Sequence, residues 1–378
     1  MFSPLDSEYM ALALRLAEQG LYSTSPNPRV GCVLVRDETI VGTGWHQRAG
    51  EAHAEVLALR AAGAAAQGAT AYVTLEPCSH FGRTPPCADA LIVAGVARLV
   101  IAMQDPNPLV AGQGSAKLRA AGIVVASGLM EAAARELNVG FVSRMTRGVP
   151  YVRSKIASSL DGRTALANGV SQWITGAEAR RDVQHWRARS CAVLTGINTI
   201  LADDAQLNVR DLATTRQPLR VVLDSQMRMP LEAKILLGGN TMIYTATQNI
   251  EKIAALKKLG VSVCVLANTN GQVDLTAMLK DLAQRGINEV LVEAGSILNG
   301  ALLQAGLVDE LLLYLAPQML GDAARGIASL GELTQLNQRI ELHWQDVRQV
   351  GNDLRIVVRV KSANPLNPPY QGEALPLP

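Results

Sequence analysis

The chain has 378 residues, of which 48% are hydrophobic and 18% are charged, and its formal net charge is +2. This length favours two domains over one, and the nearly balanced charge argues against non-specific nucleic-acid binding, which needs a basic surface. The apolar runs are too short for a membrane span, and the first residues lack the basic segment of a signal peptide. Because the five cysteines are few and scattered, a reducing, cytoplasmic location is expected.

The first 145 residues alternate between helical and strand patterns. The expected helices cover 7–20, 54–66, 87–96, 116–122 and 131–145, and the expected strands cover 30–35, 39–44, 69–77, 97–103 and 123–127. Strands and helices that alternate at these lengths predict an α/β domain of three layers. We place this domain at residues 1–146.

Two segments of this half contain candidate metal ligands. HAEVLALR begins at His53, and PCSHFGRTPPC begins at Pro77 and includes Cys78 and Cys87. Zinc prefers nitrogen and sulfur ligands, and a catalytic zinc site leaves one corner of its tetrahedron open for water. His53, Cys78 and Cys87 are therefore the expected ligands. His80 is a rival for Cys87, and lone cysteines are more often small core residues than ligands.

Glu55 follows His53 by two residues and is expected to move protons in a hydrolytic reaction, not to bind the metal. The order His-x-Glu and then Pro-Cys is typical of zinc deaminases. The cysteines are separated by eight residues, whereas the general deaminase pattern has two. From spacing alone, a chance match stays possible.

A second α/β series follows and is placed at residues 147–362, and the proline-rich segment 363–378 is expected to be disordered. The expected helices cover 177–189 and 275–286, with a further helix after Ser296, and the expected strands cover 151–158, 191–196, 219–224, 241–246, 261–266, 289–295, 310–317 and 354–360. No G-x-G-x-x-G opens a helix, so any dinucleotide would bind without the usual fingerprint.

A few polar residues stand out in the second half. Lys155 lies on an expected strand, and Arg187 shares a helical face with Arg180. Glu293 ends an expected strand, and the turn at Gly295 and Ser296 could hold a phosphate on free N–H groups. A solvated basic face and a surface turn are the plain alternatives.

HAE followed by PCSHFGRTPPC, with PNPRVGCVLV before them, closely resembles the deaminase domain of the bifunctional riboflavin-biosynthesis deaminase/reductase family. In that family the wide cysteine spacing is the usual form. KIASSLDGRTA, SQWITG, TGINTILADDAQLNVR and VEAGSILN resemble its reductase half. The resemblance implies a cytidine-deaminase-like domain followed by a dihydrofolate-reductase-like α/β domain, with one Zn²⁺ per deaminase site and NADPH as cofactors.

The resemblance also implies site residues and chemistry. The first domain would deaminate 2,5-diamino-6-ribosylamino-4(3H)-pyrimidinone 5′-phosphate, and the second would reduce the ribosyl group to ribityl. The implied pyrimidine and ribose-phosphate contacts in the first domain are Asn27, His46 and His80. The implied substrate contacts in the second domain are Ser171, Arg187, Leu207, Arg210 and Glu293. The implied cofactor contacts are Ala157, Trp173, Thr199, Asp203, Ser225, Gly295 and Ser296.

Lys155 and Asp203 are the candidates to polarise or protonate the reduced group, and Arg187 and Arg210 suit the substrate phosphate because a guanidinium matches its oxygens bidentately. Two other readings of the zinc motif stay open. One is a nucleic-acid or free-nucleoside deaminase with an unrelated second domain, and the other is a structural zinc module. The expected partner is the small phosphorylated pyrimidine, without nucleic acid or membrane, in a homo-oligomer.

Overall fold

The structure is a computed structural model that describes residues 2–79 and 86–361. The chain divides into two compact units, residues 1–148 and residues 149–378. Within the described residues, none of the helices is both long enough and apolar enough to cross a membrane.

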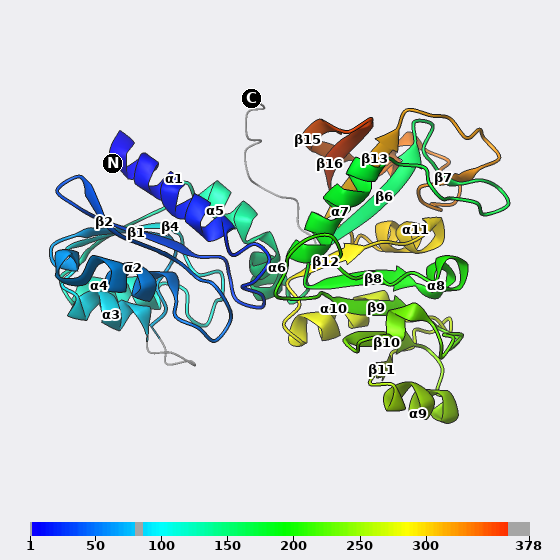
Figure 1. The fold of residues 1–378 in the computed structure, drawn as a ribbon, viewed down its shortest axis with the longest axis horizontal. Coiled ribbons are helices and arrows are strands. Elements are labelled where there is room, and N and C mark those ends of the chain that lie inside the picture. Colours follow the sequence, from blue (N-terminus) through cyan, green and yellow to red (C-terminus); the bar gives the residue numbers. More distant parts are fainter. Residues whose placement is uncertain (1, 80–85, 362–378) are drawn as a thin grey trace. The chain divides into compact units, whose positions relative to one another are not determined.

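The first unit is built on a five-stranded sheet with strand order β2-β1-β3-β4-β5. Its strands are β1 (Gly31–Arg36), β2 (Thr39–Trp45), β3 (Thr70–Leu75), β4 (Arg98–Met103) and β5 (Val124–Ser127). Its helices are α1 (Pro4–Glu18), α2 (Ala54–Ala62), the 3₁₀ turn η1 (Gly63–Ala66), α3 (Cys87–Val93), α4 (Gln113–Ala120), α5 (Glu131–Leu137) and α6 (Val139–Arg147). Helices α1 and α5 cover one face of the sheet and α2, α3 and α4 cover the other (Figure 1), so the predicted three-layer fold is confirmed.

Glycines set the distance between the helices and this sheet. A Cβ at Gly31 would lie 2.0 Å from the Ala13 carbonyl oxygen of α1, and one at Gly44 would lie 2.4 Å from the Ala54 carbonyl oxygen of α2. Only glycine allows backbones to approach so closely. This close packing places the start of α2 directly over β2.

The helix predicted over 131–145 is interrupted. At Asn138 the chain leaves α5 and enters α6, because the Asn138 amide binds the backbone of Arg29 in both directions. Its Oδ1 accepts from the Arg29 N–H at 2.8 Å, and its Nδ2 donates to the Arg29 carbonyl at 2.9 Å. A side chain that bonds to distant backbone in this way competes with regular helix, and nothing in the local periodicity indicates it.

The second unit is built on a nine-stranded sheet with order β11-β10-β9-β8-β12-β6-β13-β16-β15. Its strands are β6 (Tyr151–Ser159), β8 (Ala192–Gly196), β9 (Leu219–Leu223), β10 (Thr241–Thr245), β11 (Ser262–Val265), β12 (Glu289–Val292), β13 (Glu310–Ala316), β15 (Leu342–Val350) and β16 (Asp353–Val360). A separate small ladder joins β7 (Arg163–Ala165) and β14 (Arg325–Gly326). The strands from β11 to β13 are parallel and the β15–β16 hairpin is antiparallel.

The helices of the second unit contribute to two hydrophobic clusters. Its helical segments are α7 (Ala177–Arg189), α8 (Ile197–Asp203), η2 (Lys234–Leu236), α9 (Ile250–Lys258), α10 (Leu275–Gln284), α11 (Ser296–Gln304) and η3 (Leu336–Gln338). Helices α10 and α11 pack into one cluster, and α7, α8 and α9 pack into the other. A parallel sheet with both faces covered by helices is the arrangement that the alternating pattern predicts.

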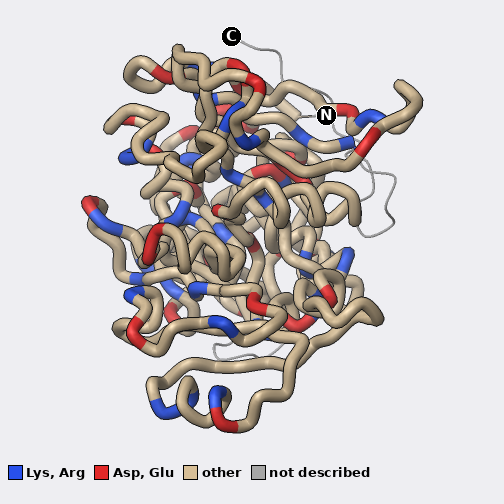
Figure 2. Tube along the Cα trace, turned by 90° about the vertical axis from the view of Figure 1, so that its right-hand side faces the viewer, with Lys and Arg blue, Asp and Glu red and all other residues tan. Residues whose placement is uncertain are grey.

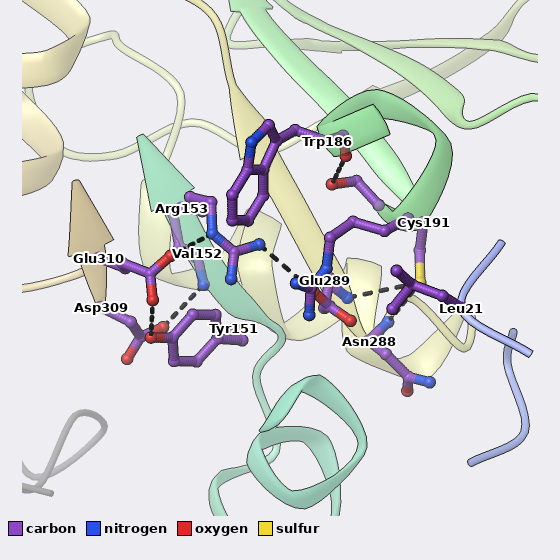
Figure 3. A network of polar contacts seen from close by, with 12 residues as sticks. Leu21, Tyr151, Val152, Arg153, Trp186, Cys191, Asn288, Glu289, Asp309 and Glu310 are labelled. Atoms are coloured by element: carbon purple, nitrogen blue, oxygen red, sulfur yellow. Dashed lines mark hydrogen bonds and ion pairs between the residues drawn. The ribbon is translucent and has the colours of Figure 1, made fainter. Parts of the chain in front are cut away.

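A buried charge network lies where several of these strands begin. The Arg153 guanidinium of β6 binds the carboxylate of Glu310 and lies 3.3 Å from that of Glu289 (Figure 3). Its centre is 4.6 Å from the centre of the Trp186 ring. All three charged side chains are buried, so removal of one partner would leave an uncompensated charge in the core.

Candidate functional site

The predicted metal ligands come together in the first unit. The Nδ1 of His53 and the sulfurs of Cys78 and Cys87 all lie within 4.8 Å of one another. His53 Nδ1 is 3.1 Å from the Cys87 sulfur and 3.7 Å from the Cys78 sulfur. One nitrogen and two sulfurs are the donor types that zinc prefers, so the residues present fit zinc.

Local structure explains why these side chains meet. His53 is the N-cap of α2, Cys78 lies in the loop after β3, and Cys87 is the first residue of α3. The Cys87 N–H donates to the Cys78 sulfur at 3.3 Å, and the Ala88 N–H donates to the Cys78 carbonyl at 3.1 Å. Free N–H groups at the start of a helix favour negative charge, and here the Cys87 N–H points at the Cys78 sulfur.

The electrostatics of the group favour an anionic sulfur. A hydrogen bond from the Cys87 thiol, with further ones from the His53 ring and the Cys87 N–H, outweighs burial and lowers the pKa of Cys78 to about 4. Cys78 is therefore a thiolate at neutral pH, which is the form that binds metal.

Glu55 lies in the first turn of α2 and is only 3% exposed. Its carboxyl group lies beside the Cys87 sulfur. Burial raises the pKa of Glu55 to about 6, although the nearby His53 charge opposes the shift. A carboxyl group with such a pKa can both accept and release a proton near neutral pH.

Asn27 and His46 lie beside the three ligands. The His46 ring is 5.2 Å from the His53 ring in an edge-on arrangement, and burial lowers the pKa of His46. Its Nδ1 is 3.2 Å from the Ala52 carbonyl oxygen, which can only accept, so Nδ1 carries the proton and Nε2 accepts from the Asn27 amide at 3.1 Å. His80, also expected in this pocket, lies outside the described residues.

In the second unit, Lys155, Arg187 and Glu293 form a cluster of charges. Arg187 binds Glu293 through two bonds, Nε to Oε1 at 2.5 Å and Nη2 to Oε2 at 3.0 Å. The Lys155 ammonium is 3.9 Å from Glu293 Oε2. Lys155 comes from β6, Arg187 from α7, and Glu293 follows β12 directly. The carboxyl ends of parallel strands are the usual place for ligand sites in such sheets.

The charges in this cluster depend on one another. Burial disfavours ionisation of Glu293, but the Arg187 and Lys155 charges outweigh it and hold its pKa at about 2. Burial lowers the pKa of Lys155, with Glu293 opposing and Arg187 reinforcing the shift. A lysine with a lowered pKa gives up its proton more readily than an exposed one.

Arg187 also holds the segment from Leu207 to Arg210. Its Nη1 donates to the Asn208 carbonyl at 3.0 Å, and the Gln184 side chain accepts from the Arg210 N–H at 2.9 Å. The Arg210 side chain itself is exposed, and its charge helps to lower the pKa of Glu293. Leu207 is buried at 4% exposure and contributes to the core. The sequence analysis missed Gln184 and Asn208, because both act on or through backbone atoms and have no spacing signal.

The residues expected to contact the cofactor are distributed over neighbouring segments. The Gln172 amide donates to Asp203 at 3.2 Å, which joins the loop of Ser171 and Trp173 to the end of α8. Trp173 is 69% exposed, with the Arg180 guanidinium 4.5 Å from its ring centre. The other expected contacts are Ala157 on β6, Thr199 in α8, Ser225 after β9, and Gly295 and Ser296 at the start of α11.

Comparisons with known proteins match both units. Residues 3–103 match the family model of the cytidine and deoxycytidylate deaminase zinc-binding region, and residues 150–356 match that of the RibD C-terminal domain. Riboflavin biosynthesis protein RibD of Escherichia coli (strain K12) is 51% identical over 362 residues, which cover 92% of this chain and 98% of that protein. The corresponding Haemophilus influenzae protein is 45% identical over 372 residues, covering 95% of this chain and 99% of its own.

Solved structures match over nearly the same length. The Acinetobacter baumannii RibD structure called form 1 superimposes with a TM-score of 0.89 at 49% identity and covers 94% of this chain and 99% of its own. A diaminohydroxyphosphoribosylaminopyrimidine deaminase/5-amino-6-(5-phosphoribosylamino)uracil reductase from Thermotoga maritima matches with a TM-score of 0.84 at 31% identity, with the same two coverages.

Proposed function

The chain belongs to the RibD family of riboflavin-biosynthesis proteins, and on this premise we propose which residues perform its two reactions. It is a bifunctional enzyme, a zinc-dependent deaminase and an NADPH-dependent reductase, with a cytidine-deaminase-like fold followed by a dihydrofolate-reductase-like fold. The substrate that we assign to the first reaction is 2,5-diamino-6-ribosylamino-4(3H)-pyrimidinone 5′-phosphate. Water replaces the 2-amino group, ammonia leaves, and the ribosyl group is then reduced to ribityl.

His53, Cys78 and Cys87 hold the zinc ion of the deaminase. The observation that supports this assignment is the convergence of their three donor atoms within 4.8 Å. When bound, zinc supplies Lewis acidity for the hydrolytic step. Three protein ligands leave a tetrahedral position open, as a catalytic site requires and a structural site usually does not.

Glu55 takes the proton that water loses and delivers it to the leaving amine. Its buried position beside Cys87 supports this role, because a carboxylate shielded from solvent exchanges its proton only with what enters the pocket. Asn27 and His46 orient the pyrimidine ring from the adjacent side, together with His80.

In the reductase, we assign the substrate phosphate to Arg210 in preference to Arg187. The Arg187 fork already binds Glu293 through two bonds, whereas the Arg210 side chain is exposed to an incoming ligand. Arg187 keeps a substrate role by fixing Glu293 and the Leu207–Arg210 segment, and Ser171, Leu207 and Glu293 complete the substrate pocket.

NADPH supplies the hydride and contacts Ala157, Trp173, Thr199, Asp203, Ser225, Gly295 and Ser296. Reduction of the ribosyl carbon also needs a proton and a polarising charge. Lys155, whose ammonium lies 3.9 Å from Glu293, supplies the charge, and burial, which lowers the pKa of Lys155, favours release of its proton. Asp203, exposed at the end of α8, is the second proton donor that we consider.

We assign deamination to residues 1–146 and reduction to residues 147–362, in keeping with the division into compact units between Gly148 and Val149. The tail 363–378, expected to be disordered, lies outside the described residues. The five free cysteines suit the cytoplasm. Basic and acidic residues are interspersed along the trace in Figure 2, which suits a small-molecule enzyme more than a nucleic-acid binder.

We also propose a homo-oligomer. Strand β15 ends the nine-stranded sheet, and its Trp344 and Val347 are 66% and 52% exposed. An exposed edge strand with large apolar side chains is a site where another chain can pair. Light scattering of the purified protein measures the mass in solution, and a monomer at micromolar concentration would contradict this assignment.

The deaminase assignment is tested by Glu55→Gln. The amide has nearly the same size but cannot accept the proton, so the variant should keep its zinc and release ammonia at least about 10²–10⁴-fold more slowly. Metal analysis and an ammonia assay measure the two properties separately. Near-normal ammonia release from a zinc-loaded variant would show that another group transfers the proton.

A further inference from the structure

Glu76 is a buried carboxylate that neither reaction uses. It follows β3 and precedes Cys78 by two residues, its side chain is only 5% exposed, and its own N–H donates to the Met103 carbonyl of β4 at 3.0 Å. A buried carboxylate is costly unless its charge is fully hydrogen-bonded. Its contacts are therefore expected to have a structural or functional purpose.

The Glu76 carboxylate accepts three backbone N–H groups from one distant segment. Oε2 accepts from Asp105 at 3.2 Å and from Gly112 at 2.9 Å, and Oε1 accepts from Ser115 at 2.8 Å. Gly112 is the N-cap of α4 and provides no side-chain cap of its own. Glu76 thus caps α4 from another part of the chain, with its negative charge at the positive end of the helix.

A second contact presses α4 against the same loop. A Cβ at Gly114 would lie 2.0 Å from the Pro77 carbonyl oxygen and 3.3 Å from the Glu76 Cγ. The first turn of α4 therefore lies directly on Pro77, the residue between Glu76 and Cys78. Helix α4 also contacts the helix that carries the other cysteine, because Lys117 pairs with Asp89 of α3 at 2.5 Å and α3 begins at Cys87.

Cys78 itself lies in neither a helix nor a strand. Its position depends on the residues immediately before it and on its contacts with the start of α3. Mutation of a residue that holds a metal ligand in place commonly weakens metal affinity by about 10–100-fold. The three bonds of Glu76 and the contact at Gly114 fix the backbone within two residues of the Cys78 sulfur.

We propose that Glu76 is a positioning residue for the metal site: it anchors the Pro77–Cys78 backbone to the N-terminus of α4 and so sets the place of the Cys78 thiolate. This inference rests on the proposed zinc role of Cys78. It concerns the geometry of the site and assigns Glu76 no contact with substrate or metal.

The test compares Glu76→Gln with Glu18→Gln, a matched change at an exposed position of α1 in the same unit. Glutamine has the same length, but its NH₂ group must face one of the three N–H donors. Glu76→Gln should bind zinc about 10–100-fold more weakly in competition with a chromophoric chelator. With Co²⁺ in place of zinc, its visible absorption bands should shift, whereas Glu18→Gln should match the wild type in both measurements.

A role in stability alone would lower the melting temperature and leave the cobalt spectrum and zinc affinity unchanged, and that result would overturn the proposal. If Glu76→Gln fails to fold, Glu76→Asp is used, which keeps the charge but is one methylene too short to reach all three N–H groups. It should show the same changes to a smaller degree, and a spectrum and affinity identical to the wild type would again overturn the proposal. Cys78→Ser separates the two hypotheses: if its zinc affinity equals that of the wild type, the proposed ligand set fails, whatever Glu76 does.

Discussion

At the scale of single residues, several buried charges in both units are stabilised by neighbouring groups of opposite charge. In the reductase cluster, Arg187 and Lys155 keep Glu293 ionised in spite of its burial. The same pairing removes Arg187 from the groups that are free to bind phosphate. For this reason we assign recognition of the phosphate to Arg210, the exposed arginine whose charge acts on Glu293.

Arg210→Ala should raise the Michaelis constant for the phosphorylated substrate of the reductase about ten-fold or more. The reason is the loss of charged hydrogen bonds worth about 1.5–3 kcal/mol, at about 1.4 kcal/mol per decade. Initial rates of NADPH oxidation measure the constant, and a dephosphorylated analogue should be almost unaffected. Arg181→Ala, an exposed position on α7, is the control. Equal losses with both substrates would withdraw the phosphate assignment.

Asp6 is a buried carboxylate of the first unit that several groups hydrogen-bond. Its carboxylate accepts from the Tyr72 hydroxyl at 2.7 Å, from the Arg98 guanidinium at 2.7 and 3.1 Å, and from the Ser3 N–H at 2.9 Å. The hydrogen bonds from Arg98, helped by those from Ser3 and Tyr72, lower the pKa of Asp6 well below its ordinary value of 3.8. A depressed pKa stabilises the fold at any pH above the ordinary value.

Asp6→Asn should therefore destabilise the first unit at pH 7, by about 1.5–3 kcal/mol for the loss of charged hydrogen bonds. The difference from the wild type should persist down to about pH 4 and shrink as the pH falls further, toward the pKa of the folded state. Hydrogen exchange in peptides of α1 and β3 measures this difference in stability. The control is Asp37→Asn, at an exposed turn position with positive φ that asparagine tolerates. A difference that does not change with pH would contradict the assignment.

At the scale of elements, glycines in β1 and β2 determine where the ligand-bearing helix lies. Gly44→Ala would put a Cβ 2.4 Å from the Ala54 carbonyl oxygen and 2.6 Å from the Ala58 N–H nitrogen, so α2 must move away from the sheet. Such overpacking typically costs about 1–3 kcal/mol. Because His53, the proposed zinc ligand, is the N-cap of α2, the variant should lose deamination and zinc affinity while NADPH oxidation is retained.

Thr43→Ala is the matched control for that variant, since Thr43 is exposed on the opposite face of β2. Ammonia release, chelator competition and NADPH oxidation give three independent measurements. Normal ammonia release by Gly44→Ala would mean that α2 adjusts without moving the site, and the argument from close packing would then be wrong.

The sequence predicts most elements, because alternating apolar patterns of ordinary length dominate both units. The misses have physical causes. Helix α8 has seven residues, too few to show a helical period, and β15 is exposed on both faces and so lacks alternation. The prediction also lacks α9, which Asn249 caps by accepting a hydrogen bond from the Lys252 N–H. The break at Asn138 depends on Arg29, far away in the chain.

The zinc site and the reductase cluster also differ in how far a sequence pattern indicates their residues. His53, Cys78, Cys87 and Glu55 are recognisable because zinc chemistry needs those residue types in that order. The bond between Arg187 and Glu293 joins residues 106 positions apart, and no local pattern indicates it. The pattern places Glu76 within the expected strand 69–77 and does not indicate its bonds, because the N–H groups that it binds belong to residues with no common side-chain feature.

At the scale of the whole molecule, the chain joins two folds, each with its own hydrophobic core and its own charged cluster. The ligands of the zinc site all precede Gly148, and the reductase cluster of Lys155, Arg187 and Glu293 follows it. We therefore assign the two sets of residues to separate reactions on successive intermediates.

The most direct test of that claim follows ammonia release and NADPH oxidation separately in the Cys87→Ser variant. Supplied with the phosphorylated diaminopyrimidine, the variant should release no ammonia. Supplied with the already deaminated compound, it should oxidise NADPH at the wild-type rate, because Cys87 belongs only to the first unit. If the folded variant loses both activities, or if it still releases ammonia at the wild-type rate, the assignment of one reaction to each unit is contradicted.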